Sequence, residues 1–95
     1  GIWVSPFEVE QSIVAHDDVI EAAVVPATDN NGLLKPKAFV VLKGNVDAEG
    51  IGESVKKHVQ ADIGKWKYPR WVEIVQDLPK TATGKIQRFK LREEA

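Results

Sequence analysis

The chain has 95 residues, of which 43% are hydrophobic and 28% charged, and a net charge of −1, which suits one small domain with a single core. It contains no cysteine, so a disulfide framework, a thiol nucleophile and thiolate metal ligands are excluded. Its apolar runs are too short to cross a membrane, and we expect a cytoplasmic domain without a membrane partner.

The first predicted element is a helix that begins at the run SPFE, residues 5–8, and ends near residues 15–17. The serine of this run can cap the free amides, the proline fits the first helical position, and the glutamate completes a capping box. Val9 and Ile13 are spaced i, i+4, which predicts that their face of the helix is buried.

Two strands are predicted next, over residues 19–25 and 37–43, with the turn cluster DNNG at residues 29–32 between them. Pro26 is expected to close the first strand, because proline cannot donate to a ladder. The second strand contains the run AFVVL, whose continuous apolar character predicts burial on both faces. We expect the two strands to form an antiparallel pair.

A second helix is predicted from Asp47, its expected cap, to Gly64, which is placed to end it. Residues 71–75 predict a third strand, and residues 87–94 a last helix or turn. The buried stripe of the second helix is spaced at i, i+4 and consists of Ile51, Val55, Val59 and Ile63. The predicted fold class is α+β: a small three-stranded sheet with two main helices packed on it and a mobile C-terminal loop.

That loop, DLPKTATGKIQR at residues 77–88, holds the residues suited to chemistry. Its pattern PxxxxGK is superficially that of a phosphate-binding P-loop. Pro79 replaces the first glycine of that motif, Ile86 stands where Ser or Thr would hold magnesium, and no strand-to-helix unit frames it. A P-loop is therefore rejected, and a solvated basic loop is the simplest alternative for a lone lysine.

The loop closely resembles the C-terminal signature of the adenylate-forming superfamily, which includes acyl- and aryl-CoA ligases, nonribosomal peptide synthetase adenylation domains and luciferase. GIWVSPFEVE at residues 1–10, the two central strands, and KWKYP at residues 65–69 resemble further landmarks in the same order. KYPRWVE at residues 67–73 and QRFKLR at residues 87–92 are similar to benzoate-type aryl-CoA ligases. The resemblance implies that residues 1–95 are the C-terminal (lid) domain, with the large N-terminal domain absent from this chain.

The resemblance assigns roles to residues of the loop. Lys85 matches the family's catalytic lysine, which touches the carboxylate and ATP together and so lowers their repulsion during adenylation. Gly84 lets the backbone approach closely, while Thr83 and Thr81 can hold the loop locally. Lys80 is expected to be a surface charge. Acetylation of Lys85 would remove the charge that the chemistry needs, which makes a lysine acetyltransferase an expected partner.

The resemblance also implies a second step, in which the domain rotates and presents another face for thioester formation. Gly1 matches a glycine that lines the pantetheine tunnel, and Trp3 packs either there or in a core or interface. Trp66, Lys67 and Arg70 match the region where some aryl-CoA ligases hold the CoA nucleotide, with an aromatic face for adenine and cations for phosphates. A rim that only packs is the alternative.

Charge is divided unevenly along the chain. Residues 1–55 carry 3 Lys/Arg against 9 Asp/Glu, whereas residues 56–92 carry 10 against 3. The basic half is either a solvated face or a surface that meets an anion, and the resemblance implies ATP and CoA in turn. The sequence begins at Gly1 and contains no methionine, so we interpret it as part of a longer protein.

No metal or cofactor is expected on this domain alone, because ATP, magnesium and the aryl carboxylate would bind mainly the N-terminal domain, its expected partner. His16 and His58 lack a second ligand at a useful spacing and are expected to be surface residues or hydrogen-bonded helix residues. Three hypotheses follow: the C-terminal domain of a benzoate-type CoA ligase, inactive in isolation; part of a carrier-protein-dependent adenylation domain; or a small basic-loop binding module. A nucleic-acid partner is not expected, since nucleic-acid binders are usually more basic.

Overall fold

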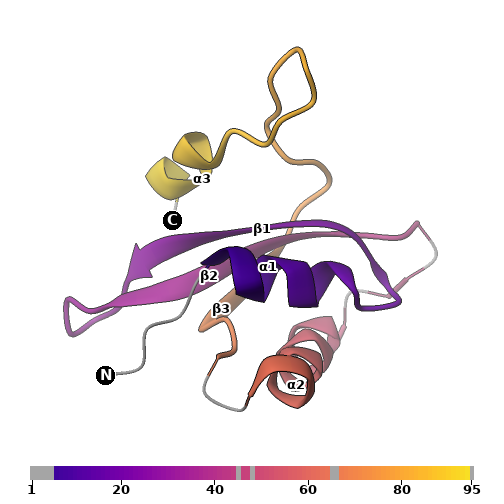
Figure 1. Cartoon of the computed structure of the whole chain (residues 1–95), viewed down its shortest axis with the longest axis vertical. Helices are drawn as coiled ribbons and strands as arrows, with labels where there is room; N and C mark the ends of the chain where they lie inside the picture. Colours follow the sequence, from indigo (N-terminus) through magenta and orange to yellow (C-terminus); the bar gives the residue numbers. More distant parts are fainter. Residues whose placement is uncertain (1–5, 45, 48, 65–66, 95) are drawn as a thin grey trace.

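The computed structural model describes residues 6–44, 46–47, 49–64 and 67–94. The predicted α+β class and three-stranded sheet with packed helices are confirmed. No helix within these residues combines the length and the apolar character that crossing a membrane requires. In chain order (Figure 1) the elements are α1 Pro6–Val14, β1 Val19–Thr28, β2 Leu34–Leu42, α2 Ile51–Ile63, β3 Trp71–Ile74 and α3 Arg88–Glu94.

The sheet has the strand order β1-β2-β3 and mixes the two pairing directions. β1 and β2 are antiparallel, as the turn cluster between them predicts. β2 and β3 are parallel, and a parallel pair needs a long crossover connection. The connection contains α2, so the order of the elements places the apolar stripe of this helix where it can cover the sheet.

β1 does not end at Pro26, as predicted, but continues to Thr28. Pro26 lies directly opposite Pro36 of β2, and neither proline has an amide hydrogen to donate. An antiparallel ladder tolerates such a pair at a position where opposite residues exchange no hydrogen bonds, and β1 is an edge strand, where proline is found. The prediction was wrong because the sequence does not show that the two prolines face each other.

Side chains of β1 alternate between two faces of the sheet. Ala22 and Val24 belong to one core cluster, whereas Ala23 and Val25 belong to another. The ladder contains a bulge just after Val19, and because of this extra residue Val19 joins the same cluster as Ala22. Both faces of the sheet are therefore buried, as the apolar run in the second strand predicts.

α1 and α2 cover the first of these faces (Figure 1). Val9 and Ile13 of α1 are fully buried, as their spacing predicts. Full burial of one such side chain stabilises the fold by about 1.5–3 kcal/mol, so Val9 and Ile13 attach α1 to the sheet. In α2 the predicted stripe is also confirmed: Ile51, Val55 and Val59 are buried, and Ile63 packs against them from a half-buried position.

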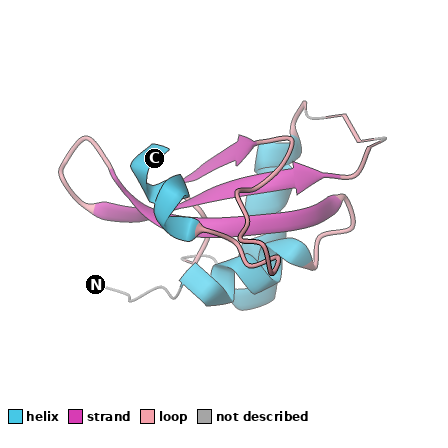
Figure 2. Cartoon of the chain, turned by 90° about the horizontal axis from the view of Figure 1, so that it is seen from above, coloured by secondary structure: helices cyan, strands magenta, loops and turns pink. Residues whose placement is uncertain are grey.

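The second face of the sheet packs against α3 and the segment before it, on the side opposite α1 and α2 (Figure 2). Phe39, in the middle of β2, is fully buried there. Leu78 and Leu91 pack in the same cluster, and Val75 and Ile86 are partly buried against it. This cluster attaches the segment that carries the candidate chemistry to the sheet.

Glycines form both ends of α2. Gly50 is the N-cap, with φ 77° and no side-chain hydrogen bond, so Asp47 is not the cap that the sequence predicts. Asp47 Oδ1 instead accepts a hydrogen bond from Glu49 N at 2.9 Å, which forms a local turn. Gly64 ends the helix as predicted, and its amide donates to Gln60 O at 3.2 Å.

Candidate functional site

Residues 79–87 form a short hairpin rather than an irregular loop; Figure 1 shows it as the orange segment that projects away from the sheet. Lys85 begins the second arm of this hairpin, directly after the tip. An antiparallel bridge joins the arms, and two backbone hydrogen bonds of 2.8 Å flank it: Gln87 N to Pro79 O, and Thr81 N to Lys85 O. The backbone of the predicted catalytic lysine is therefore held in place.

The hairpin tip is a tight turn that requires glycine. Gly84 N donates to Thr81 O at 2.9 Å, and Gly84 has φ 85°, in the left-handed region where glycine is least strained. This arrangement is a common three-residue hairpin connection. Thr81 Oγ1 accepts a hydrogen bond from Lys85 N at 3.1 Å and lies 3.0 Å from Thr83 Oγ1, so both threonines lie where they can support the turn.

Gly84→Ala is expected to destabilise the hairpin by about 1 kcal/mol, because an L side chain is strained in the left-handed region. A Cβ at Gly84 would meet nothing within 4 Å, so steric crowding adds no further cost. Hydrogen exchange of the Gln87 amide, which closes the hairpin, should become about fivefold faster.

Gly32→Ala is the matched control for this experiment. Gly32 has φ 78° and equally open surroundings, but it lies in the turn between β1 and β2. It should cost a similar amount of stability and leave exchange of the Gln87 amide unchanged. Equal acceleration by both substitutions would show that Gly84 has no local role in the hairpin.

Lys80 and Lys85 lie on opposite arms of the hairpin, and their side chains differ in partners. Lys80 Nζ lies 2.7 Å from Glu21 Oε1 in β1 and 3.6 Å from Asp77 Oδ1. The hydrogen bond to Glu21 raises the pKa of Lys80 above its usual value. Lys85 is exposed, and among the described residues its ammonium has no hydrogen bond or ion pair. Only Lys85 is therefore available to a ligand without loss of an existing ionic contact.

The second arm of the hairpin leads into Arg88, whose guanidinium binds Glu10 of α1. Arg88 Nε donates to Glu10 Oε2 at 3.1 Å, and Nη2 donates to Oε1. Glu10 is nearly buried, with 5% of its surface exposed, and its Oε2 also accepts a hydrogen bond from Val24 N at 3.1 Å. The base of the hairpin is thus attached to both α1 and β1.

Ion pairs connect the acidic first half of the chain to its basic second half. Lys67–Glu8, Lys80–Glu21 and Arg88–Glu10 join residues 59, 59 and 78 positions apart, respectively. The uneven charge distribution is therefore partly neutralised within the fold. An anion that bound Lys67, Lys80 or Arg88 would therefore have to compete with a carboxylate of the first half.

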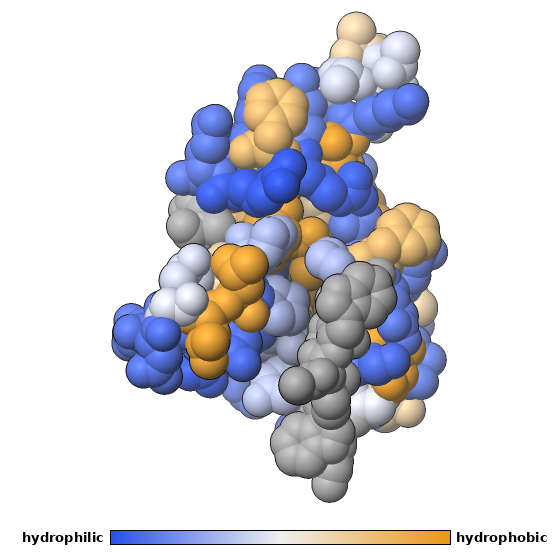
Figure 3. Space-filling model, turned by 60° about the vertical axis from the view of Figure 1, so that its left-hand side comes forward, coloured by the Kyte–Doolittle hydropathy of each residue, from blue (hydrophilic) through white to orange (hydrophobic). Residues whose placement is uncertain are grey.

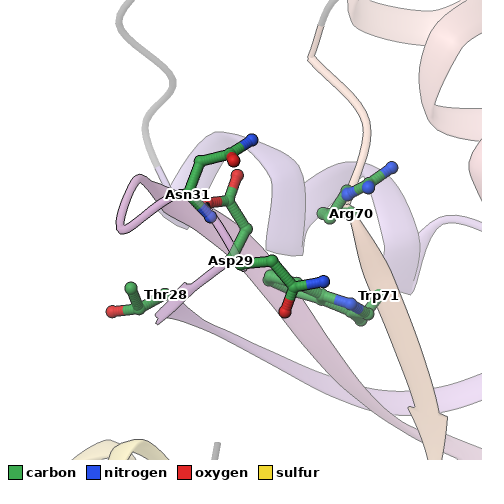
Figure 4. A pocket seen from close by; sticks show the side chains of 6 residues that line it. Thr28, Asp29, Asn31, Arg70 and Trp71 are labelled. Carbon is green, nitrogen blue, oxygen red and sulfur yellow. Dashed lines mark hydrogen bonds between the residues drawn. The ribbon is translucent and has the colours of Figure 1, made fainter.

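Arg70, one of the predicted CoA-binding residues, lines a hollow of about 200 Å³ (Figure 4). Residues 28–31, at the turn between β1 and β2, line one side; Trp71 is the first residue of β3, and Arg70 directly precedes it. The Asp29 carboxylate accepts a hydrogen bond from Leu33 N at 3.0 Å. This bond is the main reason why the pKa of Asp29 is lowered, and the charge of Arg70 adds to it. The hollow thus combines a guanidinium, an indole and a carboxylate that remains ionised.

Lys67, another predicted CoA-binding residue, is already paired with α1. Its Nζ lies 3.2 Å from Glu8 Oε1, so a phosphate group would have to replace this carboxylate. Four residues with predicted roles lie outside the described residues: Gly1, Trp3, Ser5 and Trp66. Of the four residues predicted to bind CoA, the structure therefore describes only Lys67 and Arg70.

The two histidines join the end of α1 to α2. His16 Nδ1 accepts a hydrogen bond from Asp18 N at 3.0 Å, and its Nε2 lies 2.9 Å from Ser54 Oγ. The rings of His16 and His58 meet edge to face, with their centroids 5.3 Å apart. Within the described part of the chain, no three His, Cys, Asp or Glu residues are grouped so that they could hold a metal ion. His16 therefore contributes hydrogen bonds and ring packing, whereas the buried Nε2 of His58 has no hydrogen-bond partner among the described residues.

Apolar surface is scattered on the face that Figure 3 shows, in groups separated by hydrophilic side chains. Among the described residues, the large apolar side chains that are exposed come from α1, β1, the β1–β2 turn, the start of β2 and α3: Phe7, Val14, Ile20, Leu33, Leu34 and Phe89. The described residues on this face therefore form no single continuous apolar patch.

Comparison with known protein families identifies the family of this chain. Residues 8–85 match the family described as AMP-binding enzyme C-terminal domain. The chain belongs to this family. The matched segment of this AMP-binding enzyme C-terminal domain begins in α1 and ends at Lys85, so it includes the tip of the hairpin. The resemblance inferred from the loop and the other landmarks is confirmed.

Relatives of this AMP-binding enzyme C-terminal domain include two bacterial ligases. The 4-hydroxybenzoate–CoA/benzoate–CoA ligase of Rhodopseudomonas palustris is 57% identical over 98% of the chain, and the benzoate–CoA ligase of Thauera aromatica is 58% identical over 97%. The chain spans only 18% of each relative. The solved structure of anthranilate CoA ligase AuaEII in complex with anthranoyl-AMP matches with a TM-score of 0.89 and 49% identity, over 100% of this chain and 19% of that one.

Sequence reasoning did not assign a role to Glu10, Glu21 or Trp71. A signal was present for Glu10, which is spaced i, i+3 from Ile13 and therefore lies beside the buried face of α1. No comparable signal marks Glu21, because its partner Lys80 is 59 positions away. Trp71 was assigned only to a strand, and the hollow that it lines with Arg70 is completed by the turn between β1 and β2.

Proposed function

We propose that this chain is the mobile C-terminal domain of an ATP-dependent aryl-acid CoA ligase of the benzoate type, and that Lys85 is its adenylation lysine. The observation that carries the proposal is the contrast between the two hairpin lysines. Lys80 is held by Glu21, whereas the exposed Lys85 has no ionic partner among the described residues. Relatives named as benzoate–CoA ligases, at 57% and 58% identity, support an aryl acid as the substrate.

In the first step the carboxylate of the acid attacks the α-phosphorus of ATP, forming an acyl-adenylate while pyrophosphate leaves. Two anions must approach each other, and negative charge is spread over the phosphoryl oxygens. The ammonium of Lys85 can contact the carboxylate and the nucleotide together, which lowers this repulsion. Gly84 and Thr83 hold the backbone at the tip, so the long lysine stem starts from a defined position.

In the second step the thiol of CoA attacks the acyl carbon, forming the thioester and releasing AMP. We propose that the domain has then rotated, withdrawing Lys85 and presenting Gly1, Trp66, Lys67 and Arg70 to CoA. The hollow beside Arg70 supports this, because a guanidinium and an indole suit a phosphate and an adenine ring. Lys67 would exchange Glu8 for a phosphate group.

The chain supplies only part of this machinery. It spans 18% of the relatives it matches, so we propose that residues 1–95 act with a large N-terminal domain that binds ATP, magnesium and the acid. The residues described here do not group into a metal site, and none of the steps above uses a metal held by this chain. The isolated 95-residue chain is expected to be inactive, and the whole enzyme to be cytoplasmic.

Lys85 is also proposed as a site of acetylation. It is exposed and lies beside the small residue Gly84, so a lysine acetyltransferase could reach it. Acetylation would remove the positive charge that adenylation requires. Mass spectrometry of the protein from cells would test this, and consistent absence of acetyl-Lys85 would rule the regulation out.

The proposed function is tested by assaying the full-length protein with ATP, CoA and a panel of benzoates and alkyl acids. The expected products are aryl-CoA and AMP, with benzoates preferred. Formation of aryl-adenylate without aryl-CoA, followed by transfer to the pantetheine arm of a carrier protein, would indicate a carrier-protein-dependent adenylation enzyme instead. Absence of adenylate with every acid would refute the proposal.

A further inference from the structure

Glu10 is a nearly buried carboxylate in a helix whose other most deeply buried side chains are Val9, Ser12 and Ile13. A buried charge is costly unless it is paired and hydrogen-bonded. Both oxygens of Glu10 have partners, because Oε2 accepts from Val24 N and Arg88 Nε, and Oε1 accepts from Arg88 Nη2. Glu10 thus joins α1, the edge strand β1 and the start of α3.

The position of this ion pair shows what it can do that an apolar contact cannot. α1 and α3 lie on opposite faces of the sheet, and the Glu10–Arg88 pair connects them past the open edge of β1. Apolar burial is non-directional, whereas a bidentate guanidinium–carboxylate pair also sets orientation. The pair therefore defines the angle at which the chain leaves the hairpin and enters α3.

Arg88 is close enough to Lys85 in the chain for this orientation to matter. Gln87, its neighbour, donates its amide to Pro79 O at 2.8 Å and so closes the hairpin. The half-buried Ile86 packs in the same apolar cluster as Leu91. The segment from Lys85 to Arg88 is thus held at both ends, by the tip and by Glu10.

The first arm of the hairpin has a second ion pair of the same kind. Lys80 Nζ contacts both carboxylate oxygens of Glu21, at 2.7 and 2.9 Å. Glu21 lies in β1, the strand whose Val24 amide binds Glu10. Both arms are therefore tied by carboxylates to the same edge of the sheet.

We propose that Glu10 is a positioning residue for Lys85, acting through Arg88, and that Glu21 supports the other arm through Lys80. This inference rests on the proposed role of Lys85 in adenylation. Glu10 touches no substrate. It orients the hairpin so that the lysine reaches the reacting carboxylate and phosphate when the domain is in its adenylation position.

The test uses Glu10→Gln in the full-length ligase that contains this chain. Glutamine keeps the volume and an acceptor for Val24 N but loses the charge that orients Arg88. Adenylation is measured by the exchange of labelled pyrophosphate into ATP in the presence of benzoate. Its kcat should fall by about 10–100-fold, which is the cost of a small misplacement of a reacting group. The KM values for ATP and benzoate should change by no more than about twofold.

Thioester formation from supplied benzoyl-adenylate and CoA separates positioning from general damage. Lys85 is withdrawn in this half-reaction, so Glu10→Gln should leave its rate within about twofold of the parent enzyme. Arg88→Lys, which keeps a cation beside Glu10 but not the bidentate contact, should retain more adenylation activity than Arg88→Ala. Equal loss in both half-reactions, or unchanged adenylation, would overturn the proposal.

Two further variants make the result decisive. Glu53→Gln makes the same substitution at an exposed ion pair away from the hairpin, with Lys56 at 3.9 Å on α2, and should leave both half-reactions unchanged. If Glu10→Gln does not fold, Glu21→Gln tests the same idea at an exposed pair, with a smaller selective loss of adenylation expected; no loss there would refute it. Lys85→Ala separates the failure of the proposed function from the failure of the positioning role. If Lys85→Ala spares adenylation, the proposed function fails. If Lys85→Ala impairs adenylation and Glu10→Gln does not, only the positioning role of Glu10 fails.

Discussion

Lys85→Ala in the proposed full-length ligase is expected to lower the rate of aryl-adenylate formation by about 10²–10³-fold, the usual effect of removing one charge-stabilising group from a preorganised site. The ammonium has no ionic partner among the described residues, so the substitution breaks no known ion pair and should leave the fold intact. The loss arises because the carboxylate and the α-phosphate then approach without a cation between them. Pyrophosphate exchange into ATP measures this step.

The second half-reaction and a control lysine define what this result means. Thioester formation from supplied aryl-adenylate should remain within about threefold of the parent, because the role proposed for Lys85 is confined to the first step. Lys57→Ala removes the same charge from an exposed position on α2 and should leave both rates unchanged. A similar loss from Lys57→Ala, or an equal loss of both half-reactions in Lys85→Ala, would contradict the assigned role.

Phe39→Ala is expected to reduce the free energy of unfolding of the chain by about 3–5 kcal/mol, the usual cost of truncating a buried phenylalanine. Phe39 has no exposed surface and occupies the middle of β2, where it packs between the sheet and the segments around Leu78 and Leu91. A domain of this size has a total stability of about 5–15 kcal/mol, so the variant should be close to unfolding at room temperature. Urea unfolding followed by circular dichroism measures the change.

Phe89→Ala provides a matched comparison for the core substitution. Phe89 lies in α3 and is 52% exposed, so its loss should change the free energy of unfolding by less than about 1 kcal/mol. Phe39→Leu, which keeps most of the apolar volume, should cost less than Phe39→Ala. If the alanine variants at positions 39 and 89 were equally stable, the second face of the sheet would not be a core.

The elements with strong local signals were predicted well from the sequence. The stripe containing Val55 and Val59, and the glycine at Gly64, are properties of neighbouring residues at helical spacing, and helices depend mainly on such contacts. The antiparallel pair β1–β2 followed from two apolar runs around one turn cluster. The assignment of Lys85 to adenylation also rests on a contiguous motif, and it stays a prediction.

Other features were missed because they depend on residues far apart in the chain. β1 passes Pro26 because Pro36 faces it in the neighbouring strand. Asp47 does not cap α2, because Gly50 takes that place and Asp47 binds its own local turn. The basic second half is not one uniform surface, since several of its cations are used by carboxylates of the first half.

The sequence by itself determined the α+β class, the order of most elements and the family, because periodicity, turn chemistry and contiguous motifs are encoded by neighbouring residues. Only the tertiary structure decided that Lys80 is held while Lys85 has no ionic partner among the described residues, and that Glu10 reaches Arg88, 78 positions away. The physical reason is that an ion pair depends on distance in space. Which of several lysines and carboxylates meet is settled only when the strands and helices have packed.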